Sequence, residues 1–219
     1  VLKRGVLPHH RFADHFGTYC ISLPQIEELL SADSEDTFVD QSQALCSRML
    51  VGTTKLEQKF LENIITPFIF ERSSKYIEAM KGEMDCRHSR EDDEQRSNIK
   101  ECHGGLRDME MLLLMYATKH RIRECLSRRF LRRLSEMEPE LADDFMFLDD
   151  HLTFIKNLRD VYRLKVAAHN VIAPEYLIPV TVSMGYEETA KGSRLLYDDF
   201  LKRTEIAAKV VDKLAGRVK

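Results

Sequence analysis

The spacing of apolar residues most restricts the fold of this chain, because it is helical almost from end to end. Apolar residues recur at intervals of three and four along residues 55–70 and again along 106–116. The second run places four of them on one stripe: Leu106, Met109, Leu113 and Tyr116. The 219 residues include only nine glycines and six prolines, so few positions favour turns. The pattern predicts an all-α fold.

About seven helices with short connections are expected, as a helical bundle with long antiparallel helices in the C-terminal half. They fall near residues 37–51, 55–70, 73–90, 106–120, 121–137, 139–170 and 192–216. Pro67 should kink or end the second helix. Gly185 marks a turn before the last one. The only strand candidate, 176–182, contains a proline. The charged stretch 89–98 is expected to be a loop, with a solvated helix end as the alternative.

The composition argues against some classes of partner and indicates a cellular location. A net charge of −3 gives no bulk attraction to nucleic acid, and we expect no nucleic-acid partner. No apolar run is long enough to span a membrane, so no membrane partner is expected. The five cysteines are odd in number and scattered, which is typical of reduced thiols. We therefore expect a cytoplasmic protein.

The segment "NIKECHGGLRDMEMLLLMY", which starts at Asn98, is the strongest candidate for a site. The N–H groups and the dipole at a helix start favour anions, and glycine allows a close approach to the backbone. Lys100 and Arg107 flank the glycines, so a phosphate there would meet two cations. Asp108 and Glu110 would contact a metal or orient the cations. The alternative is a tight turn whose charges pair with one another.

This segment resembles "(D/N)-(I/L)-K-x-G-x-G-G-(L/I)-R-(D/E)-x-(E/Q)" of bacterial PII uridylyltransferases and glutamine synthetase adenylyltransferases. The matching residues are Asn98, Ile99, Lys100, Gly104, Gly105, Leu106, Arg107, Asp108 and Glu110. The sequence departs from the pattern at Cys102 and His103. Weaker similarities extend from about Phe38 to the end of the chain. They include the positions Arg48, Gly52, Leu56, Arg159, Tyr197 and Arg203.

The resemblance implies the helical domain of a nucleotidyltransferase, which assists transfer of a nucleoside monophosphate from UTP or ATP to a protein acceptor. The nucleotide-binding residues would be Lys100, Gly104, Gly105 and Arg107, and the supporting residues Asp108, Glu110 and Arg159. Residues 36–219 would form this domain, and residues 1–35 would be a linker or the remnant of an upstream catalytic domain. That domain would be a partner of this one.

Catalysis in this superfamily requires a small sheet with Gly-Ser and Asp-x-Asp, whose carboxylates hold Mg²⁺. The chain lacks this set, so we expect no catalytic residue in it and an inactive chain in isolation. Mg²⁺ with UTP or ATP would bind only with the catalytic domain. A diverged relative of these enzymes that has lost catalysis would show the same sequence features. The alternative function is a non-catalytic helical module for regulation or protein interaction.

Three other features have simpler interpretations. Cys86, His88, Cys102 and His103 contain zinc-ligand types, but their spacing is irregular, and we expect no metal in this chain. The arginines of residues 121–133 are expected to form a solvated face paired with acids rather than a phosphate-binding surface. His151 is expected to be exposed within the long helix, and His169 to lie at its end.

Overall fold

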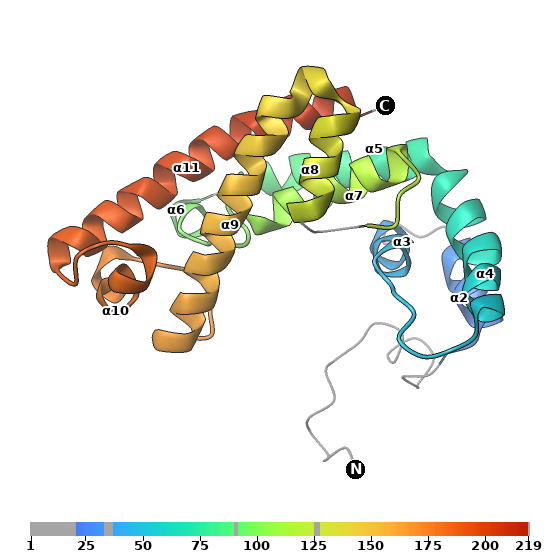
Figure 1. Ribbon diagram of the computed structural model, residues 1–219, viewed down its shortest axis with the longest axis horizontal. Coiled ribbons are helices and arrows are strands. Elements are labelled where there is room, and N and C mark those ends of the chain that lie inside the picture. Colours follow the sequence, from blue (N-terminus) through green and yellow to red (C-terminus); the bar gives the residue numbers. More distant parts are fainter. Residues whose placement is uncertain (1–20, 33–36, 90–91, 125–127, 219) are drawn as a thin grey trace, which may run out of the picture. The chain divides into compact units, whose positions relative to one another are not determined.

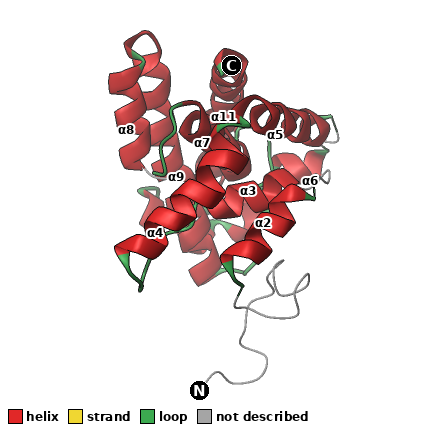
Figure 2. Ribbon diagram, turned by 90° about the vertical axis from the view of Figure 1, so that its right-hand side faces the viewer, coloured by secondary structure: helices red, strands yellow, loops and turns green. Residues whose placement is uncertain are grey.

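The computed structural model describes residues 21–32, 37–89, 92–124 and 128–218. Within these ranges the chain forms ten α-helices and no strands (Figure 2). The all-α prediction is confirmed. The number of helices exceeds the expected seven because several are very short. None of the described helices combines the length and apolarity needed to cross a membrane.

The chain divides into two compact units, and the first ends at Arg72. Its described helices are α2 (Leu23–Ser31), α3 (Thr37–Leu45), α4 (Thr54–Phe60) and a π-helix (Leu61–Phe70). Leu30, Leu45 and three isoleucines of the π-helix are fully buried. The expected domain boundary between residues 35 and 36 falls at residues 33–36, which lie outside the described residues.

One helix prediction in this unit was wrong, and one of two alternatives for another is excluded. The helix that begins at Thr37 ends at Leu45, not near residue 51. The Ser47 hydroxyl and the Ser47 N–H both donate to the carbonyl of Ala44, and such local bonds compete with helix continuation. Of the two outcomes expected at Pro67, an end of the helix is excluded, because Pro67 lies inside a π-helix that runs from Leu61 to Phe70. Proline lacks the N–H and crowds the carbonyl that an α-helical turn would use, whereas the π-helix has a different bonding pattern.

The second unit contains residues 73–219, and Figure 1 shows its described helices. Its α-helices are α5 (Ser73–His88), α6 (Asp93–Arg96), α7 (Leu106–Lys119), α8 (Arg128–Met137), α9 (Ala142–Lys165), α10 (Ile178–Thr181) and α11 (Ala190–Arg217). Short 3₁₀ turns cover Pro139–Leu141, Pro174–Tyr176 and Val182–Met184. The charged stretch is therefore partly helical, and the strand candidate is a helix.

Helix α7 lies in the core of this unit. All but three of its 14 residues are buried, and the predicted apolar stripe is at most 2% exposed. Helices α5, α9 and α11 all contact it. A helix that is apolar on nearly every side must be surrounded by other elements. The start of α7 is therefore enclosed by protein as well.

The long helices α9 and α11 run in roughly opposite directions, and α8 lies beside α9 (Figure 1). Arg128 Nε donates to Asp149 Oδ1 at 2.6 Å, and Arg132 Nε donates to Asp149 Oδ2 at 3.2 Å. The bond from Arg128 lowers the pKa of Asp149. These arginines are paired with an acid, as the solvated-face interpretation expects. Because α9 ends at Lys165, His169 lies beyond the helix rather than at its end.

Candidate functional site

The loop before α7, residues 97–105, is called the Gly-Gly loop here. The side chain of Asn98 shapes its first turn, because Asn98 Oδ1 accepts hydrogen bonds from the N–H groups of Lys100 and Glu101 at 3.0 and 3.1 Å. The N–H of Ile99 donates to the carbonyl of Asn170 at 2.9 Å. Asn98 also forms an isolated bridge with Val171. The loop is thus held at its start by the segment that follows α9.

The two glycines allow close packing. Gly104 has φ +77°, and a Cβ there would lie 2.3 Å from the backbone oxygen of Thr204 and 2.6 Å from the backbone nitrogen of Ala208. At Gly105 a Cβ would lie 2.7 Å from the carbonyl oxygen of Cys102. No side chain fits at those distances. The glycines therefore let the loop lie directly against the backbone of α11 and against itself.

Asp108 holds the loop from inside. Its carboxylate is fully buried, and Oδ2 accepts bonds from the Gly104 N–H and from His88 Nε2, both at 2.8 Å. Burial favours the neutral form of His88, but the hydrogen bond and the charge of Asp108 outweigh this and raise the pKa of His88. Arg87 Nη1 lies 3.9 Å from Asp108 Oδ1. Asp108 therefore fixes the loop to α5, a structural role that the sequence did not indicate.

His151 supports the loop from α9. It is fully buried, and its Nε2 donates to the carbonyl of Gly104 at 3.0 Å. Burial lowers the pKa of His151, and the hydrogen bond to Gly104 raises it by less. The resulting pKa is about 4. The expectation that His151 is exposed was wrong, because this face of α9 covers the Gly-Gly loop.

The first N–H groups of α7 have partners within the chain. The N–H of Leu106 donates to the carbonyl of Ile99 at 3.2 Å, and that of Arg107 donates to the carbonyl of Lys100 at 2.9 Å. The Gly105 N–H donates to the carbonyl of Cys102 at 2.8 Å. These three N–H groups are therefore not available to an anion near this turn.

Three cations surround one carboxylate on the surface of this loop. Arg87 Nη2 lies 2.8 Å from Glu101 Oε2, while Lys100 Nζ and Arg107 Nη2 lie 3.2 and 4.0 Å from Glu101 Oε1. Arg107 also pairs with Glu110 at 3.2 Å. We call Arg87, Lys100 and Arg107 the cation cluster. The fold thus brings together the two cations predicted from the sequence.

Arg87 was missed in the sequence analysis. It lies near the end of α5, and only the packing of α5 against α7 brings it to the Gly-Gly loop. Its side chain is 15% exposed, against 34% for Lys100 and 39% for Arg107. The nearest signal in the sequence is a basic residue in the last turn of a helix, which is too common to indicate a site.

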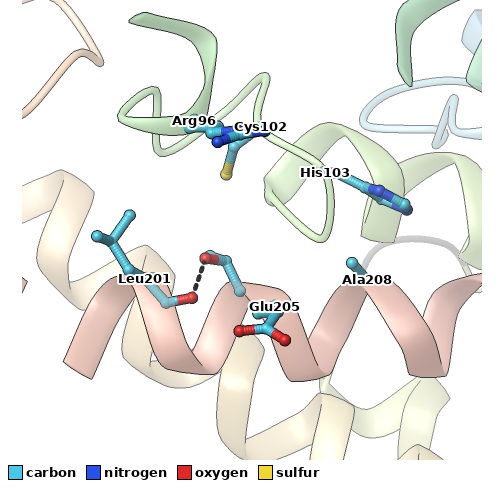
Figure 3. Close-up of a pocket in the computed structure, with 7 residues that line it drawn as sticks. Arg96, Cys102, His103, Leu201, Glu205 and Ala208 are labelled. Atoms are coloured by element: carbon cyan, nitrogen blue, oxygen red, sulfur yellow. Dashed lines mark hydrogen bonds between the residues drawn. The ribbon is translucent and has the colours of Figure 1, made fainter. Parts of the chain in front are cut away.

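Two pockets adjoin the Gly-Gly loop. One of about 360 Å³ is lined by Arg87 and Glu101 together with Asp92, Glu94, Gln95 and Asn98. The other, of about 380 Å³, lies between the loop and α11, where the sulfur of Cys102 points toward α11 (Figure 3). Neither pocket includes Lys100 or Arg107 in its lining. These two cations lie in partly exposed ion pairs.

The remaining predicted residues are distributed over three helices. Glu110 lies beside Arg107 on α7, within the reach of the cation cluster. Arg159 on α9 pairs with its neighbour Asp160 at 2.8 Å, and we find no ion pair from it to the loop in the described part of the chain. Tyr197 on α11 forms a hydrogen bond of 2.8 Å with Ser97, the first residue of the loop.

These features define an all-α domain built around a buried helix start, with a glycine loop that displays cations at its surface. The chain belongs to the GlnD PII-uridylyltransferase family, because the model of that family matches residues 75–218. This range lies within the second unit. The suspected family resemblance is therefore confirmed. No curated protein and no solved structure matches the chain.

Proposed function

We propose that this chain contributes the helical domain of a PII-uridylyltransferase-like enzyme, which assists nucleoside monophosphate transfer from UTP or ATP to a protein acceptor. A nucleotidyltransferase domain outside this sequence would perform the chemistry, with Mg²⁺ bound there, and the enzyme would work in the cytoplasm. The family match over residues 75–218 supports this proposal. The observation that carries the site is the convergence of the cation cluster on Glu101.

The cluster has the charge to hold a polyphosphate. Its three cations contact Glu101 and Glu110, and Arg87 also lies 3.9 Å from Asp108, a carboxylate that His88 shares. A triphosphate or pyrophosphate carries more negative charge than Glu101 and offers paired oxygens to the guanidinium fork of Arg107. In this proposal, the phosphates replace Glu101 as the partner of Lys100 and Arg107. The exposed ion pairs that would be lost are weak.

The other predicted residues then have supporting roles. Gly104 and Gly105 give the loop the shape that presents Lys100, and Asp108 holds that shape through the Gly104 N–H. Glu110 orients Arg107. Arg159 remains a proposed supporting residue. It would contact the site only through the bound nucleotide or through the catalytic domain.

The test measures transfer of label from UTP and from ATP by the full-length protein that contains this chain. Lys100→Ala combined with Arg107→Ala should reduce transfer by about 100-fold, since two hydrogen bonds to a charged group are lost. The matched control is Arg194→Ala with Lys209→Ala. These two cations of α11 are 64% and 72% exposed and form surface ion pairs, so the charge change is the same.

Two results would decide against the proposal. If neither nucleotide is transferred by the unmodified protein, the domain does not serve a nucleotidyltransferase. If transfer occurs and both double variants retain it equally, then Lys100 and Arg107 are only surface ion pairs. The domain would then be a regulatory or protein-interaction module.

A further inference from the structure

Two histidines and a carboxylate meet on the second unit beside the Gly-Gly loop. His88 is the last residue of α5, His103 lies in the loop, and Asp212 lies on α11. One ligand atom from each residue lies within 4.8 Å of the other two. Asp212 is 109 positions beyond His103, so only the packing of α11 against the loop creates this group. We propose that His88, His103 and Asp212 bind a divalent transition-metal ion, with Zn²⁺ as the best fit.

The ligand types match that ion. Zn²⁺ accepts imidazole nitrogen and carboxylate oxygen, and three protein ligands leave a fourth position for water. The sequence analysis considered Cys86 and Cys102 beside the histidines and expected no metal. Cys102 is buried, and its sulfur lies 2.9 Å from the position that a Cβ of Gly105 would take. The group that the fold brings together therefore contains a carboxylate in place of the two thiols.

A second, independent feature resembles the surroundings of known metal-binding histidines. His88 Nε2 donates to the buried carboxylate of Asp108 at 2.8 Å, which leaves Nδ1 as the nitrogen with a lone pair. Metal-bound histidines usually donate their other ring N–H to such a carboxylate, which fixes the ring and increases the basicity of the ligating nitrogen. His88 is therefore oriented in advance.

Two of the three residues also line a pocket. A pocket of about 360 Å³ is lined by His88 and Asp212, with Asp85 as a further carboxylate. Lys81 lines the same pocket, but its ammonium group donates to the carbonyl of Val218 at 2.7 Å. The ion would thus have access from solvent.

Metal binding requires one movement. The rings of His88 and His103 are stacked, with centroids 3.7 Å apart and planes at 25°. Lone pairs lie in the ring plane, so nearly parallel rings cannot both point at one ion. His103 is the ring that turns, because its side chain is 26% exposed and its partner Asp212 is 55% exposed. The ion would then join α5, the Gly-Gly loop and α11.

The test is a titration of the metal-stripped 219-residue chain with Zn²⁺ at neutral pH, followed by calorimetry. One equivalent should bind, and the melting temperature should rise with Zn²⁺ concentration. His103→Gln and Asp212→Asn should each weaken binding by at least about 100-fold, since loss of an outer-shell partner alone costs 10- to 100-fold. Both side chains are partly exposed, so the variants should fold. Circular dichroism checks this.

The matched controls are His169→Gln and Asp198→Asn, two exposed positions on the same unit that should leave Zn²⁺ affinity unchanged. Co²⁺ then reports the ligand types, because a site of nitrogen and oxygen lacks the near-ultraviolet bands of thiolate ligation. Failure to bind Zn²⁺, equal binding by His103→Gln and Asp212→Asn, or thiolate bands with Co²⁺ would each overturn the proposal. The His88–Asp108 and His103–Asp212 pairs would then be hydrogen bonds that only hold packed segments together.

Discussion

Individual residues of the Gly-Gly loop separate into a buried group and a surface group. Gly104, Leu106 and Asp108 are buried and determine how the loop packs, whereas Lys100 and Arg107 remain partly exposed. A short motif can therefore combine residues needed for the fold with residues available to a ligand. The two kinds respond differently to substitution, and Gly104 offers the clearest example.

Gly104→Ala should destabilise the protein by more than about 2 kcal/mol. The positive φ of Gly104 is unfavourable for alanine, and the new Cβ would overlap backbone atoms of α11 that cannot move aside easily. Chemical denaturation monitored by circular dichroism measures the change in the free energy of unfolding.

Gly82→Ala is the matched control. Gly82 lies within α5, and no atom lies within 4 Å of the position of its added Cβ. Alanine should stabilise that helix by about 0.5–1 kcal/mol. Equal effects of the two substitutions would contradict the packing role assigned to Gly104.

Among the helices, α9 acts on the candidate site through one buried contact. His151 donates to the carbonyl of Gly104, and Phe147 lies one turn earlier on α9 with its ring nearly parallel to the imidazole. The contact requires a neutral His151, because burial makes the charged form unfavourable. The packing of α9 against the loop should therefore depend on pH.

We expect stability to fall as the pH decreases from about 6.5 to about 4. The pKa of His151 is about 4 in the folded chain against 6.5 as the ordinary value, so in this window the unfolded state binds a proton that the folded state does not. Across this window the free energy of unfolding falls by about 3 kcal/mol through His151. Denaturation of the wild type and of His151→Gln at several pH values measures it, since glutamine can still donate to Gly104.

The variant isolates His151 from the other titrating groups. The raised pKa of His88 acts in the opposite direction, because its contribution is present below the unfolded value and is lost as pH rises through the folded value. Both proteins retain His88, so its effect cancels in the comparison. Identical pH dependence of the two proteins would contradict the role of a neutral His151.

At the level of the whole chain, the second unit has the features of an independent domain. It contains α7 with the helices that surround it, and the family match lies within its limits. Its buried residues form one apolar core that includes Tyr116, Phe145 and Phe200. Domains with their own core generally fold alone.

We expect a protein of residues 73–219 to fold without the first unit. It should retain helical circular dichroism and unfold in a single cooperative transition, because α7 keeps all of its contacts with α5, α9 and α11. Binding of hydrophobic dyes by the fragment, together with the absence of a sharp unfolding transition, would contradict this prediction. The full-length chain under the same conditions is the control.

The helical periodicity was sufficient to predict the fold class and the buried stripe of α7, because these depend on neighbours three or four residues apart. The turn at Gly185 was indicated by the glycine itself. The Gly-Gly segment was sufficient to indicate the family. The helix end at Leu45 and the continuation through Pro67 depended on local backbone bonding that hydrophobic spacing does not reveal.

Contacts between distant segments depended on the packing of helices in three dimensions. The approach of Arg87 to Glu101, the burial of His151 on Gly104 and the meeting of His103 with Asp212 join residues that lie 14, 47 and 109 positions apart. No periodicity specifies such pairs, because each depends on how a helix packs against the Gly-Gly loop. The sequence therefore indicated which residue types form the candidate site, and the packed fold determined which of them meet.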